Sequence, residues 1–202
     1  MKIQDGWLLG VLTGDGCIGE RFIQFTNNNV ELIKLFLNRI MELNISVSEI
    51  VANINTTTNL KNDAENLKAT LLKLGVKKVF ITLVKQNLKK PVIQLFFFDR
   101  KTANDFRKNI SMFLKIPLTQ EIPSFIKGFF DAEGSIHKRD KAIEARQKCN
   151  KKGKRIMKFL ELNLKRLGIK CSLEGPNCET VSYTHLRAHE TEADLVCRLL
   201  LE

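Results

Sequence analysis

The chain has 202 residues, 44% of them hydrophobic and 27% charged, which is typical of a protein that folds around a core and excludes a disordered chain. No run approaches the roughly 18 to 20 apolar residues of a membrane helix, and the N-terminal region has no signal-peptide core, so we expect a soluble, intracellular protein without a membrane partner. Lysine and arginine number 33 against 22 acidic residues, a net charge of +11.

The positive charge is concentrated in one window. Residues 134–170 hold thirteen basic residues against three acidic ones. Such a field favours a polyanion, because neutralised phosphates release counterions. A membrane surface is a weaker alternative, since the window lacks an aromatic and leucine face, and a solvated lysine-rich surface is the third reading.

In chain order, the first apolar segment is Trp7–Ile18, and it recurs without gaps at Phe125–Ile136. Both copies carry small residues at the fourth and eighth positions, followed by an acid. Each copy then continues with a strand-like run, at 23–26 and 142–147, an Asn-bearing turn and an amphipathic helix.

Between the copies, the pattern predicts a helix over 62–74, strands over 79–85 and 92–98, and a helix over 101–114 that begins at Asp99. Each unit therefore follows the order helix, two strands, helix, two strands, helix. The predicted fold class is a duplicated α+β protein.

The last residues break this pattern. Residues 181–202 contain no lysine or phenylalanine and resemble the translated read-through of a sequencing adapter, so we expect a non-native tail. The predicted organisation is a first unit over 1–116, a partial second unit over 117–180 and a tail over 181–202. The second unit is then expected to lack its last strands and its closing helix.

The repeated segments also predict a site. Small residues four apart on each helix allow two backbones to approach closely. The predicted helix-interface residues are Gly10, Gly14, Gly128 and Ala132. This packing would set Asp15 and Glu133 side by side at two helix C-termini, where the macrodipoles add negative potential.

Two such carboxylates need a counter-charge, and a hard divalent cation supplies it. The predicted ligands of Mg²⁺, or Mn²⁺, are Asp15, Glu133 and the last-turn carbonyls of Gly14 and Ala132. Bound metals activate water and clamp the oxygens of a phosphodiester, so the pattern predicts phosphodiester hydrolysis.

Both segments resemble the LAGLIDADG motif of homing endonucleases. Leu8–Gly16 matches it with Thr13 and Gly14 in place of Asp and Ala, and Ile126–Gly134 matches it with its two acids in register. The resemblance implies a pseudo-twofold monomer of two αββαββα units, the second incomplete here, whose antiparallel sheets form a DNA-binding saddle. It also implies that Asp15 and Glu133 are the metal-binding acids.

The family often places a Gln-Lys pair at the end of the second strand, near the site. Gln147 and Lys148 fit that place and are predicted catalytic helpers. The first unit offers Asn27-Asn28 instead, and His137 and Lys138 are alternative basic groups.

Side chains that alternate away from the helices are expected to contact DNA. The predicted DNA-binding residues are Gln24, Thr26, Asn28, Gln94, Arg146, Lys148, Lys151, Lys152 and Lys154.

We therefore expect a free-standing, intron-encoded, site-specific endonuclease that cuts double-stranded DNA as a monomer. The alternative is a non-catalytic nucleic-acid binder, either a group I intron RNA maturase with intron RNA as its partner or a degenerate regulator.

Overall fold

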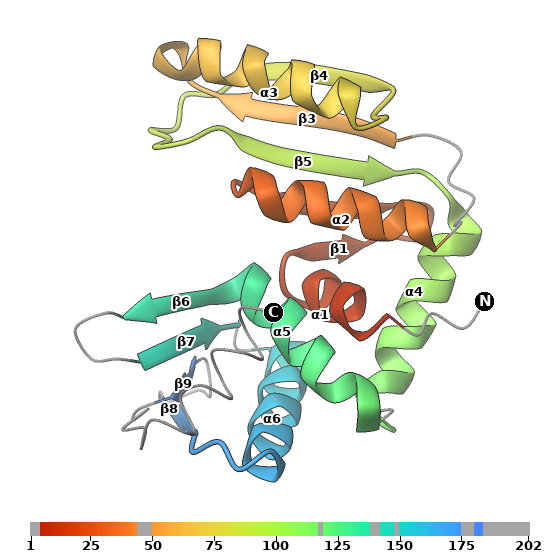
Figure 1. Cartoon of the computed structure of the whole chain (residues 1–202), viewed down its shortest axis with the longest axis vertical. Coiled ribbons are helices and arrows are strands. Elements are labelled where there is room, and N and C mark those ends of the chain that lie inside the picture. Colours follow the sequence, from red (N-terminus) through yellow and green to blue (C-terminus); the bar gives the residue numbers. More distant parts are fainter. Residues whose placement is uncertain are drawn as a thin grey trace. The chain divides into compact units, whose positions relative to one another are not determined.

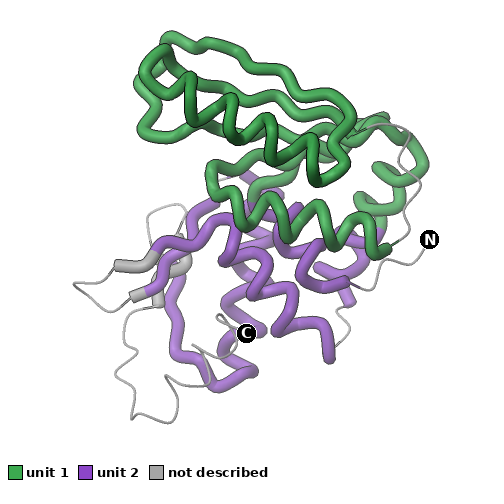
Figure 2. Tube along the Cα trace, turned by 45° about the horizontal axis from the view of Figure 1, so that its top comes forward, with its two compact units in different colours: residues 1–3, 15–108 green, residues 4–14, 109–202 purple. Residues whose placement is uncertain are grey.

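The computed structural model describes residues 5–43, 50–116, 119–137, 142–147, 150–174 and 180–183. The chain divides into two compact units (Figure 2): unit 1 comprises residues 1–3 and 15–108, and unit 2 comprises residues 4–14 and 109–202. Each unit combines helices with a sheet, so the predicted α+β class is confirmed. The first motif helix belongs to unit 2, whereas the repeat predicted that it belongs with residues 1–116.

Unit 1 contains a five-stranded sheet in the order β1-β2-β5-β3-β4 (Figure 1). Its elements are β1 (Gly16–Ile18), β2 (Ile23–Asn27), α2 (Val30–Glu42), β3 (Ile50–Thr56), the short η1 (Thr58–Leu60), α3 (Lys61–Lys73), β4 (Lys78–Leu83), β5 (Val92–Phe97) and most of α4 (Arg100–Phe113).

The sheet differs from the expected antiparallel one in a single pair. β3 and β4 run parallel and are joined by the crossover helix α3, while all other neighbours are antiparallel. The sequence pattern did not predict β3, although its positions alternate strictly between buried and half-buried. Asparagines at two of these positions, Asn53 and Asn55, lower the β-propensity of the segment, so the strand could not be recognised from its sequence.

One face of this sheet forms the core of unit 1. Phe36 of α2 packs on Phe25 and Phe97, with ring centroids 4.3 and 5.7 Å apart. Helix α3 packs on the same side, over β3 and β4. The strand residues that alternate with this core point to the opposite face of the sheet.

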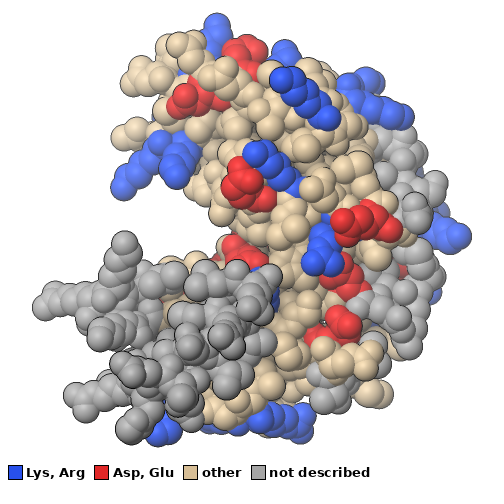
Figure 3. All heavy atoms as spheres, viewed as in Figure 1, with Lys and Arg blue, Asp and Glu red and all other residues tan. Residues whose placement is uncertain are grey.

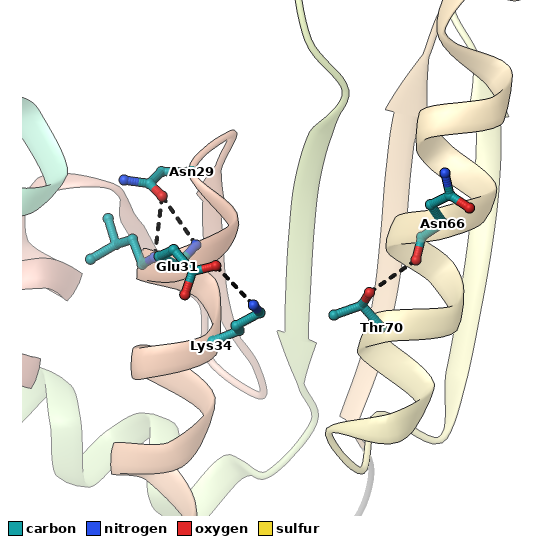
Figure 4. Close-up of polar contacts among 6 residues, drawn as sticks. Asn29, Glu31, Lys34, Asn66 and Thr70 are labelled. Atoms are coloured by element: carbon teal, nitrogen blue, oxygen red, sulfur yellow. Dashed lines mark hydrogen bonds and ion pairs between the residues drawn. The ribbon is translucent and has the colours of Figure 1, made fainter.

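Local signals place the helices of unit 1. Asn29 caps α2, because its side chain accepts hydrogen bonds from the backbone N–H groups of Glu31 and Leu32 (Figure 4). Helix α3 ends before Gly75, whose φ of +90° is the left-handed conformation that favours glycine at this place. Asp99 accepts hydrogen bonds from the backbone of Lys101 and Thr102, as expected for the start of α4.

Unit 2 contains a four-stranded sheet in the order β6-β7-β9-β8, with antiparallel neighbours. Its elements are α1 (Gly6–Gly14), the end of α4, η2 (Thr119–Glu121), α5 (Ile122–Glu133), β6 (Gly134–His137), β7 (Ala142–Arg146), α6 (Lys151–Arg166), β8 (Ser172–Glu174) and β9 (Thr180–Tyr183). Its aromatic core includes Phe125, which stacks on Phe113 at 4.8 Å and meets Phe159 edge-on at 5.3 Å.

The end of the chain differs from expectation. β8 and β9 supply the strands that the second unit was expected to lack, and β9 pairs with both β7 and β8. Three of its four residues, Thr180, Val181 and Tyr183, are β-branched or aromatic, which suits a strand. Residues 181–183 of the predicted non-native tail are thus part of the sheet, while residues 184–202 lie outside the described residues.

None of the helices in the described ranges is long and apolar enough to cross a membrane.

Candidate functional site

The two motif helices, α1 and α5, pack against each other within unit 2. A Cβ atom on Gly10 would lie 2.1 Å from the carbonyl oxygen of Phe125, and a Cβ on Gly128 would lie 2.1 Å from that of Trp7. Real atoms do not approach so closely, so only glycine allows this backbone contact. The structure thus places two of the four predicted interface residues where the helices are nearest.

The carboxyl ends of these helices also meet. A Cβ on Gly14 would lie 2.9 Å from both the Cβ of Ala132 and the Cγ of Glu133. The other two predicted interface residues, Gly14 and Ala132, therefore contact each other across the pair. Asp15 is the next residue of the chain and opens unit 1.

The two acids of the second motif have different surroundings. Asp131 accepts a hydrogen bond from the indole Nε1 of Trp7 at 2.7 Å, which ties α5 to α1. Burial raises the pKa of Asp131, and the Trp7 hydrogen bond and the Lys127 charge offset part of that rise. The equivalent residue of the first motif, Thr13, is buried and donates to the Leu9 carbonyl at 2.6 Å, so it needs no partner on the other helix.

This contact predicts a pH-dependent effect of Asp131→Asn. The folded-state pKa of Asp131 is raised, so the wild type loses stability as the pH rises from below the usual carboxyl pKa through the raised value. The amide keeps an oxygen for the Trp7 N–H but carries no charge. The stability gain of Asp131→Asn is therefore expected to be near zero in acid and to grow toward neutral pH, as measured by urea unfolding across that range. A loss of stability at neutral pH would contradict this role.

Glu133, the last residue of α5, is half-buried. Its Oε1 accepts a hydrogen bond from Gln147 Nε2 at 2.8 Å. Burial raises the pKa of this carboxyl, and the Gln147 hydrogen bond offsets part of the rise. Within the described residues this is the only hydrogen bond that Glu133 receives, so its other oxygen faces no protein donor there.

Asp15 has an equivalent partner in unit 1. Its Oδ2 accepts a hydrogen bond from Asn27 Nδ2 at 2.6 Å. The side-chain oxygen of Asn27 accepts a hydrogen bond from the backbone N–H of Asn29 at 2.7 Å. This bond orients the side-chain NH₂ group of Asn27 toward Asp15.

Strand register shows that the two amides correspond. Gly16, just after Asp15, pairs with Phe25, and Gly134, just after Glu133, pairs with Ala145. Asn27 and Gln147 each lie two residues beyond those partners. The sequence places Asn27-Asn28 where the second unit has Gln147-Lys148, but Asn27 was not among the predicted site residues; counting from the hairpin register identifies it as the partner of Asp15.

The other predicted catalytic helpers are not described. Lys148 and Lys138 lie outside the described residues, as does the side chain of His137. No group of three His, Cys, Asp or Glu residues that could hold a metal occurs in the described part of the chain.

The donor set nevertheless fits a hard divalent cation. Carboxylate and backbone carbonyl oxygens are the ligands that Mg²⁺ takes, and Mg²⁺ usually keeps several waters and needs only one or two carboxylates. The half-buried Glu133 carboxylate has an oxygen without a protein donor among the described residues. Burial disfavours its charged form, as its raised pKa shows, and a bound cation would stabilise that charged form.

The outer face of the unit 1 sheet carries polar side chains. Gln24 and Thr26 of β2 and Gln94 of β5 point away from the core and are half-buried, and Asn28 is exposed just after β2. Three further polar residues of this face were not predicted, because β3 was not predicted and the sequence did not show which side chains of β4 point outward. They are Asn53, Asn55 and Thr82.

The predicted basic residues of unit 2 lie on two elements. Arg146, at the end of β7, is exposed and forms an ion pair with Glu144 at 3.0 Å. Lys151, Lys152 and Lys154 are exposed on the first turns of α6, not on a strand or loop. On the face drawn in Figure 3, basic side chains stand at several separate places among acidic ones.

Residues 121–196 match the family described as "LAGLIDADG-like domain". This part of the chain, which includes the second motif, is therefore similar to a LAGLIDADG-like domain, and the resemblance based on the motifs is confirmed. No curated protein sequence matches the chain.

The chain is similar in fold to solved LAGLIDADG proteins. A structure of the homing endonuclease I-DmoI in complex with DNA and Mn has a TM-score of 0.58 at 18% sequence identity, covering 98% of this chain and 96% of that one. Full-length DUF199/WhiA from Thermatoga maritima has a TM-score of 0.57 at 14% identity, covering 96% of this chain and 54% of that one. I-DmoI has also been solved with DNA and Ca, at a TM-score of 0.55 and 18% identity, covering 91% of this chain and 83% of that one.

Proposed function

We propose that this protein is a site-specific endonuclease that cuts double-stranded DNA with a divalent metal, Mg²⁺ or Mn²⁺, held by Asp15 and Glu133. One observation carries the proposal. The acids at the same position of two repeated motifs each accept a hydrogen bond from a side-chain amide at the same strand register. A turn that merely ends a helix needs neither the acid nor its amide, so the duplication of both favours a functional pair.

Chain connectivity supports a joint action of the two acids. Gly14 contacts the Glu133 side chain, and Asp15 follows Gly14 directly. The backbone carbonyls of Gly14 and Ala132 are the proposed further oxygen ligands. A bound cation would supply an activated water and neutralise charge on the phosphodiester.

The chain's own residues have distinct tasks in this proposal. Asn27 and Gln147 orient the two carboxylates by donating to one oxygen of each. Glu133 must lose its proton before it can bind a cation, and its raised pKa makes this step sensitive to mild acid. Lys148, next to Gln147 in the chain, is the proposed basic group near the leaving oxygen.

The proposed target is a long, asymmetric duplex bound by a monomer. The DNA-bound I-DmoI structures share this fold, which supports DNA as the ligand of this protein. We propose that the outer face of unit 1 and Arg146 meet base edges, and that the lysines at the start of α6 meet phosphates. The proposed gene context is an intron.

A selection followed by a cleavage assay tests this function. Duplexes enriched from a random pool by the full chain are incubated with it in Mg²⁺ and, separately, in EDTA. The proposal expects both strands to be cut in Mg²⁺ alone. Enriched duplexes that stay intact in Mg²⁺ and Mn²⁺, with tighter binding of structured intron RNA, would establish a non-catalytic binder of the maturase type.

A further inference from the structure

We infer that the outer face of the unit 1 sheet is a reader of A·T base pairs, so that one half of the bound duplex is A·T-rich. This inference rests on the proposed function, and it adds the base composition that unit 1 selects. The polar residues of this face are Gln24, Thr26, Asn53, Asn55, Thr82 and Gln94.

Asn53 organises the amides of this face. Its Nδ2 donates to Asn55 Oδ1 at 3.1 Å and to Gln94 Oε1 at 3.5 Å, and its Oδ1 accepts the Thr82 hydroxyl at 2.8 Å. The partners on both sides hold Asn53 in place. A pre-ordered side chain loses less entropy when it binds a ligand.

The neighbours of Asn53 keep hydrogen-bonding groups for a ligand. The NH₂ groups of Asn55 and Gln94 donate no hydrogen bond within the described residues, and each oxygen retains a second lone pair. An amide that offers a donor and an acceptor together matches the N7 and N6 edge of adenine in the major groove. Gln24, which donates to Thr26 Oγ1 at 3.0 Å, adds another amide one strand away from Gln94.

Apolar side chains lie between these amides. Strand register places Gln24 opposite Phe96, Phe96 opposite Val51, and Asn53 opposite Phe80. Phe80 is 56% exposed, so it can make contact with a bound molecule. Apolar groups in the major groove meet the methyl group of thymine, the other half of an A·T pair.

Arginine, the side chain that most commonly reads guanine, is absent from the strands of this sheet. None of the five strands of unit 1 contains an arginine, which pairs with guanine O6 and N7, whereas β7 of unit 2 carries Arg146. Lys78 is the one basic residue in those five strands, at the start of β4. The two units therefore differ in whether their strands offer an arginine to a guanine edge.

Selection of fully randomised duplexes by the full chain, followed by sequencing, tests the inference. The wild type is expected to enrich a site with an A·T-rich half. Gln94→Ala is expected to lose the A·T preference at one or two positions of that half, with about 10-fold weaker binding, and Gln94→Arg to prefer guanine there. Asn66→Ala is the matched control, because Asn66 is an exposed amide on helix α3 (Figure 4), which packs on the opposite face of the sheet, and it should leave the preference unchanged.

Two results would overturn the inference while leaving the proposed function standing. One is a site that the wild type cuts but in which neither half is A·T-rich. The other is a Gln94→Arg variant that melts like the wild type and selects the wild-type sequence at every position. Failure to enrich any duplex would instead refute the proposed function itself.

Discussion

Replacing Asp15 by Asn, or Glu133 by Gln, is expected to lower the rate of DNA cleavage in Mg²⁺ by more than about 100-fold, because loss of a direct metal ligand should exceed the 10- to 100-fold cost of losing an outer-shell partner. Each change keeps the size of the side chain and an oxygen for the amide of Asn27 or Gln147. The free energy of DNA binding should change little, since base and phosphate contacts come from other residues. Single-turnover cleavage and equilibrium binding of the same duplex separate the two effects.

Asp131→Asn is the matched control for these substitutions. It makes the same carboxylate-to-amide change two residues before Glu133 on the same helix, but Asp131 faces Trp7. Cleavage by Asp131→Asn should stay close to that of the wild type. If this control loses as much activity as Glu133→Gln, the effect reflects damage to the α1–α5 pair rather than loss of a metal ligand.

Gly10→Ala and Gly128→Ala are expected to be the most destabilising single methyl additions in unit 2. Each new Cβ would lie 2.1 Å from a backbone carbonyl oxygen of the facing helix, where no side-chain rotation can relieve the overlap. The helices must move apart, and the loss is expected to reach about 3 kcal/mol of unfolding free energy, the upper end for overpacking. Urea unfolding monitored by circular dichroism measures it.

Gly168→Ala provides the comparison for that loss. Gly168 also lies in unit 2, but a Cβ there would meet no atom within 4 Å, and only its φ of +80° disfavours alanine. The expected cost is about 1 kcal/mol. Equal losses at Gly10 and Gly168 would contradict a backbone-to-backbone contact between α1 and α5.

The repeat in the sequence predicted the pairing of the two motif helices. Small residues four apart on both motif helices allow their backbones to approach closely, and the structure has α1 and α5 in contact at Gly10 and Gly128. The helix over 62–74 and the strand over 92–98 followed equally well from their apolar spacing. These elements are local, so a local pattern suffices to predict them.

Features that depend on strand pairing were harder to predict. β3 is interrupted by two asparagines and pairs with strands far along the chain, so neither its propensity nor its neighbours marked it. The role of Asn27 depends on the register of the β1–β2 hairpin. The sequence alone does not specify that register, because the turn that sets it was not predicted. β9 lies in a segment whose composition looked foreign, and only its pairing with β7 and β8 identifies it as a strand.

The central claim is that Asp15 and Glu133 serve one metal-dependent cleavage centre. A double-mutant cycle of single-turnover cleavage in Mg²⁺ tests it most directly, using the wild type, Asp15→Asn, Glu133→Gln and the double variant on one enriched duplex. Residues that act as a unit are strongly non-additive, so the double variant should be scarcely slower than either single variant. Cleavage that survives either single substitution, or losses that simply multiply in the double variant, would contradict the claim.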